Sequence, residues 1–134
     1  MREKKVLLID DEEDMDWLLK KILNEAGYDC LTATTGKEGV EIFDMFSKEI
    51  GAVILDLKLP DMNGWEVLDD IKLCNPLIKA IIITAFGTPE ARKTAGEKEV
   101  YSFVDKPFKV EDMLKTVEEA LKEGGHKTRI EGVF

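Results

Sequence analysis

The chain has 134 residues, which is enough for one domain with a buried core and too short for two ordinary domains. Its 19 basic and 28 acidic side chains leave a net charge of −9, which argues against binding to nucleic acid or to an anionic membrane surface. A composition of 44% hydrophobic and 35% charged residues is typical of a globular protein.

The first residues and the cysteines indicate where the protein resides. Only four apolar residues (6–9) follow the basic start, which is too few for a signal peptide, and no stretch approaches the length of a membrane span. Cys30 and Cys74 lack the spacing of a zinc site or a disulfide framework, and we interpret them as small core hydrophobes in a reducing compartment. We therefore expect a cytoplasmic protein that binds no membrane.

Short apolar runs alternate along the chain with helical patterns. In chain order the predicted elements are a strand at 6–9, a helix closed by Gly27, a strand at 29–33, a helix at 40–46, a strand at 52–55, a helix at 65–71, a strand at 80–83, a helix starting at Thr88-Pro89, a strand at 102–104 and a helix at 114–121 ended by Gly124-Gly125. The unalternating runs are typical of parallel strands covered on both faces, whereas 29–33 suits an edge strand. We expect one α/β domain over residues 1–124, followed at 125–134 by a tail or the start of a linker.

Polar side chains follow the carboxyl ends of four predicted strands. Asp10-Asp11 follow the first strand, Asp56 the third, Thr84 the fourth and Lys106 the fifth. In the doubly wound order 2-1-3-4-5, the first and third strands are neighbours where the strand order reverses, so three carboxylates meet at one edge of the sheet. Each residue alone has an ordinary explanation as a helix cap, a turn former, a strand residue or a solvated charge. Those explanations do not account for their meeting at one edge.

The chemistry of this set points to phosphoryl transfer. Three close carboxylates repel one another unless one of them holds a proton or a cation joins them. A hard divalent cation with oxygen ligands, Mg²⁺ first, removes that repulsion. One carboxylate is then left to react, Lys106 balances the incoming negative charge, and the Thr84 hydroxyl donates a hydrogen bond to it.

Four segments together resemble the receiver domain of two-component response regulators. They are VLLIDDE (residues 6–12), ILDLKLPDMNG (54–64), TA (84–85) and FVDKPF (103–108). The resemblance extends from about residue 4 to about residue 123. It implies a flavodoxin-like α/β fold, with a doubly wound five-stranded parallel sheet of order 2-1-3-4-5 and helices on both faces.

The resemblance also implies the chemical roles of the site residues. Asp56 is expected to accept a phosphoryl group from a sensor histidine kinase, a phosphotransfer protein or a small phosphodonor. Asp10, Asp11 and Asp56 are expected to hold Mg²⁺ together with the backbone carbonyl of Lys58. Lys106, whose bond to the following proline is typically cis in the family, is expected to pair with the phosphoryl group.

In the family, phosphorylation changes the surface built by the fourth helix, fifth strand and fifth helix. Thr84 is expected to move toward the new phosphoryl oxygens, and Phe103 occupies the aromatic switch position. The resemblance implies a signalling switch rather than an enzyme, although such a domain catalyses its own phosphotransfer and its own slow dephosphorylation. Its output is the control of an output domain or partner, and a homodimer on phosphorylation is one such output.

The sequence departs from the family's pattern at three places. Glu99-Val100 stand where receiver domains usually carry a Gly-Ala pair, so we expect the fourth helix to end early or fray. Lys58 and Phe86 are larger than many residues at their positions. Because they flank the approach of water to Asp56, we expect them to slow the loss of the phosphoryl group.

Three alternatives compete with this interpretation. A phosphatase with an aspartyl nucleophile needs a second acid two residues later. Lys58 stands there after Asp56, and although Glu12 stands there after Asp10, the intervening residue is also an acid, so the pattern fails. A flavin-binding module needs a loop of Ser, Thr or Gly after the first strand, where residues 10–14 are all acidic. A degenerate receiver, acting as an interaction module without being phosphorylated, stays open as the alternative.

Overall fold

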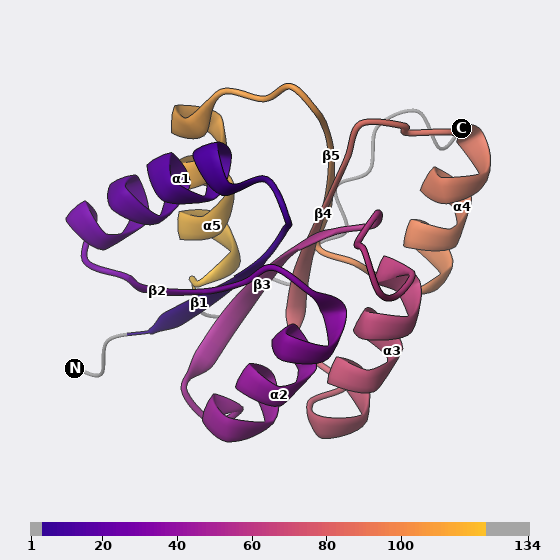
Figure 1. Cartoon of the computed structure of the whole chain (residues 1–134), viewed down its shortest axis with the longest axis horizontal. Coiled ribbons are helices and arrows are strands. Elements are labelled where there is room, and N and C mark those ends of the chain that lie inside the picture. Colours follow the sequence, from indigo (N-terminus) through magenta and orange to yellow (C-terminus); the bar gives the residue numbers. More distant parts are fainter. Residues whose placement is uncertain (1–3, 123–134) are drawn as a thin grey trace.

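The computed structural model describes residues 4–122, and its five strands form one parallel sheet in the predicted order β2-β1-β3-β4-β5 (Figure 1). The strands are β1 (Lys5–Ile9), β2 (Asp29–Ala33), β3 (Ile50–Asp56), β4 (Lys79–Thr84) and β5 (Ser102–Asp105). The helices are α1 (Glu13–Glu25), α2 (Gly36–Phe46), α3 (Gly64–Cys74), α4 (Pro89–Glu97) and α5 (Val110–Ala120). The α/β fold and the edge position of β2 are confirmed.

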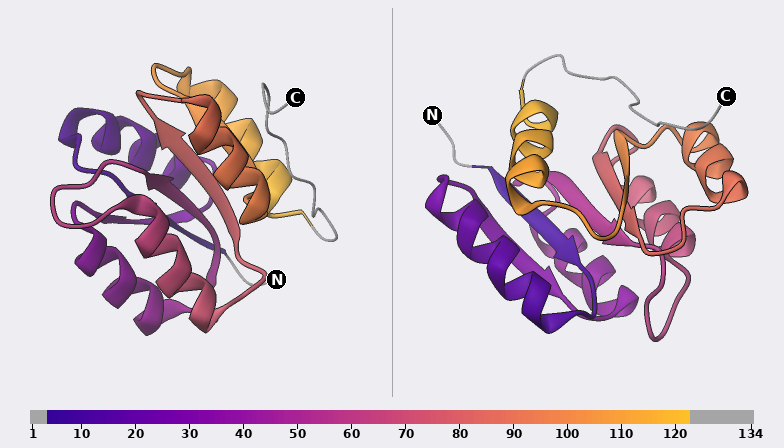
Figure 2. Two further views of the ribbon diagram at one scale, coloured as in Figure 1. Left: turned by 90° about the vertical axis from the view of Figure 1, so that its right-hand side faces the viewer. Right: turned by 90° about the horizontal axis from the view of Figure 1, so that it is seen from above.

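Helices cover both faces of the sheet, which is why the strands carry unalternating apolar residues (Figure 2). On one face, Leu19 of α1 and Val117 of α5 pack with the strand residues Leu8 and Ile81. The opposite face is covered by α2, α3 and α4. Each of β1, β3 and β4 therefore contributes side chains to both cores.

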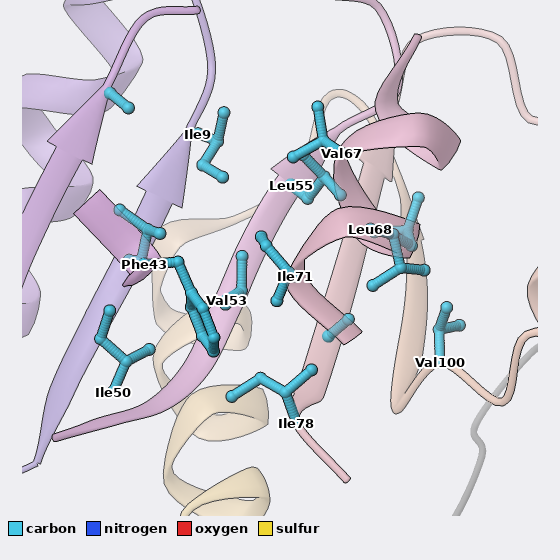
Figure 3. Close-up of a cluster of buried hydrophobic side chains, with 14 of the residues drawn as sticks. Ile9, Phe43, Ile50, Val53, Leu55, Val67, Leu68, Ile71, Ile78 and Val100 are labelled. Atoms are coloured by element: carbon cyan, nitrogen blue, oxygen red, sulfur yellow. The ribbon is translucent and has the colours of Figure 1, made fainter. Parts of the chain in front are cut away.

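The core under α2, α3 and α4 is apolar throughout. Figure 3 shows Phe43 of α2 and Ile71 of α3 converging on Val53 of the central strand β3. Val100, which precedes β5, extends this cluster on the side of α4. The burial holds the ends of β3 and β4 in fixed positions relative to α3.

Several details of the elements differ from the sequence expectation. Asp56 and Thr84 are the last residues of their strands rather than residues after them, because the ladders extend that far. In α1 the inward positions are Asp16, Leu19 and Leu23, so Leu18 of the expected stripe is 41% exposed. α5 ends at Ala120, before the expected end at Gly124-Gly125, and that glycine pair with the tail 125–134 lies outside the described residues.

Glu99-Val100, the pair expected to make the fourth helix end early or fray, lies just beyond the end of α4. The last residue of α4 is Glu97, and Glu99 adopts a φ of 55°, the left-handed conformation that favours glycine. Val100 is fully buried. The Lys72 ammonium of α3 donates to the carbonyl of Lys98, so a neighbouring helix caps this end of α4.

Helix length also bears on the membrane expectation. The longest helix, α1, has 13 residues. Over residues 4–122 no helix combines the length and apolar character that a bilayer crossing requires.

Candidate functional site

The predicted acidic residues meet where the strand order reverses. Asp10 follows β1 directly, and Asp56 ends the neighbouring β3, whose Leu55 pairs with Ile9. Asp10, Asp11 and Asp56 each offer a carboxylate oxygen, and these oxygens lie within 4.8 Å of one another. Asp10 and Asp56 are buried, whereas Asp11 is exposed. Asp11 is therefore the most solvent-exposed of the three carboxylates.

The local backbone fixes the Asp56 carboxylate. The Lys58 amide donates to its Oδ1 at 2.9 Å. Gly64, the first residue of α3, lies so close to this turn that a Cβ there would be 2.7 Å from the Asp56 carbonyl oxygen, which only glycine tolerates. The side chain of Asp56 thus has one oxygen bound to its own turn and one facing the cleft.

Lys106 joins the carboxylates across the sheet. Its Nζ lies 2.8 Å from Asp56 Oδ2 and 3.3 Å from Asp10 Oδ2. It also forms an ion pair with Glu12. The Lys106 amide donates to the carbonyl of Thr84 at 2.8 Å, and the bond to Pro107 is cis, as the resemblance implied. The ammonium relieves part of the repulsion among the carboxylates, in addition to any relief from a metal ion or a bound proton.

Burial and charge set the protonation of the cluster. Burial raises the pKa of Asp10 to about 6, with a further increase from the charge of Asp56, while the Glu12 amide and Lys106 lower it. Burial alone lowers the pKa of Lys106, but its hydrogen bonds to Asp56 and Glu12 outweigh this and hold the pKa above its ordinary value. Lys106 therefore stays charged at neutral pH, and Asp10 holds its proton to a higher pH than an ordinary aspartate, although it is mostly ionised at pH 7.

Sequence reasoning missed two acidic residues at this site. Glu12 was assigned no role, yet it pairs with Lys106 at the mouth of the cleft. Asp16 is 6% exposed, neither of its oxygens has a hydrogen-bond partner among the described residues, and burial together with the charge of Asp10 raises its pKa to about 7. The signal for Asp16 was its spacing from Leu19 and Leu23, which places it on the inner stripe of α1.

The proposed switch residues lie beside the acidic cluster on the next two strands. Thr84 is buried at the end of β4, and its Oγ1 accepts a hydrogen bond from the Phe86 amide at 3.1 Å. Its register partner in β5 is Asp105, two residues after Phe103. The Phe103 ring is buried toward α4 in the core. Thr84 and Phe103 therefore lie on neighbouring strands. Within residues 4–122, the Thr84 hydroxyl forms no hydrogen bond with the carboxylates of the acidic cluster.

Lys58 and Phe86 border the cleft, as expected, but they contact each other. The Lys58 Nζ lies 5.7 Å from the centroid of the Phe86 ring. Together they line a cleft of about 220 Å³ that contains Asp11, Asp56 and Lys106. The Lys58 ammonium thus lies at the ring, at the edge of the opening, because a cation is attracted to an aromatic face.

The donor set fits a hard divalent cation. Three carboxylates within reach of one ion offer oxygen ligands only, which is the chemistry that Mg²⁺ prefers. The raised pKa of Asp10 indicates that negative charge here is costly without a cation. The backbone carbonyl of Lys58 as a further ligand stays a prediction.

Comparisons with known proteins agree with the geometry. Residues 6–118 match the sequence pattern of the response regulator receiver domain. The chain is 31% identical over 117 residues to the DNA-binding transcriptional regulator NtrC of Escherichia coli, covering 87% of this chain but 24% of that protein. It is 29% identical over 121 residues to the sporulation initiation phosphotransferase F of Bacillus subtilis, covering 90% and 96%. Among solved structures, a response regulator receiver domain protein from Clostridium thermocellum superposes with a TM-score of 0.82 at 30% identity, covering 88% and 94%.

Proposed function

Because the chain belongs to the response regulator receiver domain family of two-component systems, we propose that it accepts a phosphoryl group on Asp56 and converts it into a change of the surface formed by α4, β5 and α5. The observation that carries the proposal is the meeting of Asp10, Asp11 and Asp56 with the Lys106 ammonium, from three strand ends, around one small cleft. Asp56 is the carboxylate that combines burial with an oxygen facing that cleft.

Asp56, the Lys58 amide and Lys106 have separate roles in the phosphoryl transfer. An Asp56 oxygen forms a bond to phosphorus while the bond from phosphorus to the donor, such as a histidine nitrogen, breaks, and the donor atom keeps the electron pair. The Lys58 amide holds the other oxygen of the Asp56 carboxylate, which orients the nucleophile. Lys106 lies close enough to Asp56 to pair with the transferred group and balance its charge.

Mg²⁺ is the cofactor that we assign to this site, as receiver domains generally bind it at an acidic pocket. Asp10, Asp11 and Asp56 would hold it, with the Lys58 carbonyl as a further ligand. When bound, it supplies positive charge that neutralises the carboxylates and the incoming phosphoryl oxygens. Adding Mg²⁺ should raise the melting temperature because only the folded state gathers the ligands. Asp11→Ala should remove that rise, and Glu13→Ala, an exposed acid in the next helix, should keep it.

The switch that we propose starts at Thr84. A hydrogen bond from its hydroxyl to a phosphoryl oxygen on Asp56 draws the end of β4 toward the acidic cluster. Phe103, buried on the neighbouring strand, then repacks against α4. The added charge of about −1.5 to −2 supplies the bias between the two arrangements.

The partners follow from the family and its relatives. We propose a sensor histidine kinase or a phosphotransfer protein as the donor, and either a homodimer formed on phosphorylation or an output domain as the recipient of the signal. The chain spans about a quarter of the NtrC relative, a DNA-binding regulator, and nearly all of the sporulation phosphotransferase. We propose residues 1–124 as the receiver unit and 125–134 as a tail or the start of a linker.

Phosphorylation with a small donor tests the function. Incubation with acetyl phosphate or phosphoramidate and Mg²⁺ should add one phosphate, labile to hydroxylamine as acyl phosphates are. Asp56→Asn should abolish the addition, while Asp70→Asn, an exposed acid on α3, should leave it intact. Full labelling of Asp56→Asn would contradict the assignment of the acceptor. If the parent protein takes up no phosphate from any donor, the phosphorylation-independent interaction module is the better description.

A further inference from the structure

One arginine connects α4 to β5, the strand next to the one that ends at Thr84. The Arg92 guanidinium forms an ion pair with Asp105 at the end of β5. The same guanidinium lies 4.9 Å from the centroid of the Phe103 ring. The Arg92 side chain is 15% exposed although it is charged, which shows that it lies against the body of the domain. We call these three residues, Arg92, Phe103 and Asp105, the Arg92 clamp.

The loop between β4 and α4 packs directly on the clamp. Gly87 lies in this loop, and a Cβ built on it would overlap the Asp105 carboxylate and stand 2.9 Å from Arg92 Nη2. A side chain at position 87 would therefore force the Asp105 carboxylate to move. The loop, the helix and the strand therefore meet at the guanidinium, so a shift of the loop must be followed by α4 or must break the clamp.

Thr84 is linked to the same place by two short paths. Its Oγ1 accepts a hydrogen bond from the Phe86 amide, next to Gly87 in the loop. Its register partner across the sheet is Asp105 itself. A displacement of Thr84 toward Asp56 thus acts on the clamp both through the loop and through β5.

The clamp is a large part of what holds α4, because this helix buries little apolar surface. Ala95 is its one buried residue, whereas α3 buries four. At the other end, Lys98 pairs with Asp69 of α3 at 2.8 Å, and Lys72 donates to the Lys98 carbonyl. A helix held by polar contacts at two ends can change position when one set of contacts is lost.

We propose that Arg92 is a positioning residue that holds α4 in the unphosphorylated arrangement, and that the pull on Thr84 acts by breaking the Arg92 clamp. The inference rests on the proposed phosphorylation of Asp56. A contact that forms in only one of two arrangements stabilises that arrangement by the free energy of the contact. By linkage, a ligand that binds the other arrangement must overcome this free energy. Loss of the clamp therefore favours the switched arrangement and tightens the binding of whatever stabilises it at Asp56.

Beryllofluoride with Mg²⁺, a mimic of the phosphoryl group, provides the test. We would measure two quantities for the parent and for Arg92→Ala: the apparent affinity of the protein for beryllofluoride, and the rates of amide hydrogen exchange in α4. The variant should bind beryllofluoride about three- to tenfold more tightly, since an ion pair and a cation–π contact of this kind are each worth a small factor. In the absence of beryllofluoride, the amides of α4 in the variant should exchange at rates close to those of the beryllofluoride-bound parent. Equal or weaker affinity in Arg92→Ala would overturn the proposal.

Two further variants separate a clamp from general loosening of α4. Asp105→Asn keeps the ring contact and removes the ion pair, so it should tighten binding by a smaller factor; weaker binding than the parent would count against the clamp. Lys98→Ala frees the far end of α4 from Asp69 and should raise exchange there without changing beryllofluoride affinity. If Lys98→Ala tightens binding as much as Arg92→Ala, loosening alone is sufficient and the proposal fails. A parent that binds no beryllofluoride would instead contradict the proposed function.

Discussion

The two helices that follow the proposed acceptor and the proposed switch residue are attached to the sheet in different ways. α3 comes after Asp56 and packs into the apolar core shown in Figure 3. Its buried residues are Gly64, Val67, Leu68 and Ile71. α4 comes after Thr84 and buries only Ala95, so it depends on ion pairs and on hydrogen bonds at its ends.

This difference separates a fixed half of the site from a movable half. A nucleophile must be held in position for chemistry, and apolar burial of α3 supplies that rigidity to the turn that carries Asp56. A switch must have a second arrangement of similar free energy, and polar contacts at the protein surface are worth little enough to exchange. The comparison predicts which substitutions change global stability and which change only α4.

The largest expected effect comes from the core of α3. Leu68→Ala should lower the free energy of unfolding by about 2–5 kcal/mol, because Leu68 is fully buried and its loss leaves a cavity. Leu73→Ala makes the same chemical change on the same helix at a side chain that is 84% exposed, and it should stay within about 0.5 kcal/mol of the parent. Denaturation in urea measures both. Similar losses for the two variants would remove the basis of the comparison.

The second effect is on the pH dependence of the free energy of unfolding, and it comes from Asp16. This residue is the one charged side chain on the otherwise apolar inner face of α1. The folded-state pKa of Asp16, about 7, lies above the ordinary value of 3.8. Between those values the folded state keeps a proton that the unfolded state has released. Stability therefore falls as pH rises through this window, by at most about 1.4 kcal/mol per pH unit.

Asp16→Asn should remove this dependence. Relative to the parent, the variant should gain melting temperature from pH 4 to pH 7, and the difference should be constant above pH 7. Asp14→Asn, on the exposed face of the same helix, should follow the parent at every pH. A parent-to-Asp16→Asn difference that does not vary with pH would show that this carboxyl is not the titrating group.

A smaller effect compares the caps of the two helices. Asn63 starts α3 in a capping box with Glu66, and Thr88 starts α4 by accepting from the Ala91 amide at 3.1 Å. Each side-chain cap is worth about 1 kcal/mol to its own helix. Asn63→Ala should reduce the global free energy of unfolding, whereas Thr88→Ala should mainly increase amide exchange in the first turn of α4. Equal global losses would mean that α4 unfolds only with the whole domain.

The smallest expected effect concerns the contact between the two loops. Lys58 belongs to the loop before α3 and Phe86 to the loop before α4, and their cation–π contact borders the opening to Asp56. Lys58→Asn combined with Phe86→Glu should open the path of water and speed the decay of the phosphorylated protein by about a few fold. Lys93→Asn, an exposed lysine of α4, is the matched control. Decay no faster than that of the parent would refute water exclusion by this pair.

The architecture and the polar composition of the site can be predicted from the amino-acid sequence. Unalternating apolar runs indicate strands covered on both faces, and Asp10, Asp56, Thr84 and Lys106 stand at or just after the ends of such runs. Parallel strands bring their carboxyl ends to one edge, and the strand order 2-1-3-4-5 places the ends of the first and third strands side by side.

The choice of partner for each charged side chain depends on tertiary packing. Lys106 pairs with Glu12 as well as with Asp10 and Asp56, and Asp16 faces inward without a partner among the described residues. The ion pair of Arg92 with Asp105 depends on how α4 lies against β5. Long charged side chains reach several neighbours, and the choice among them depends on burial and on the relative placement of elements distant in sequence. Local patterns carry no information about that placement, which is set by the packing of the whole domain.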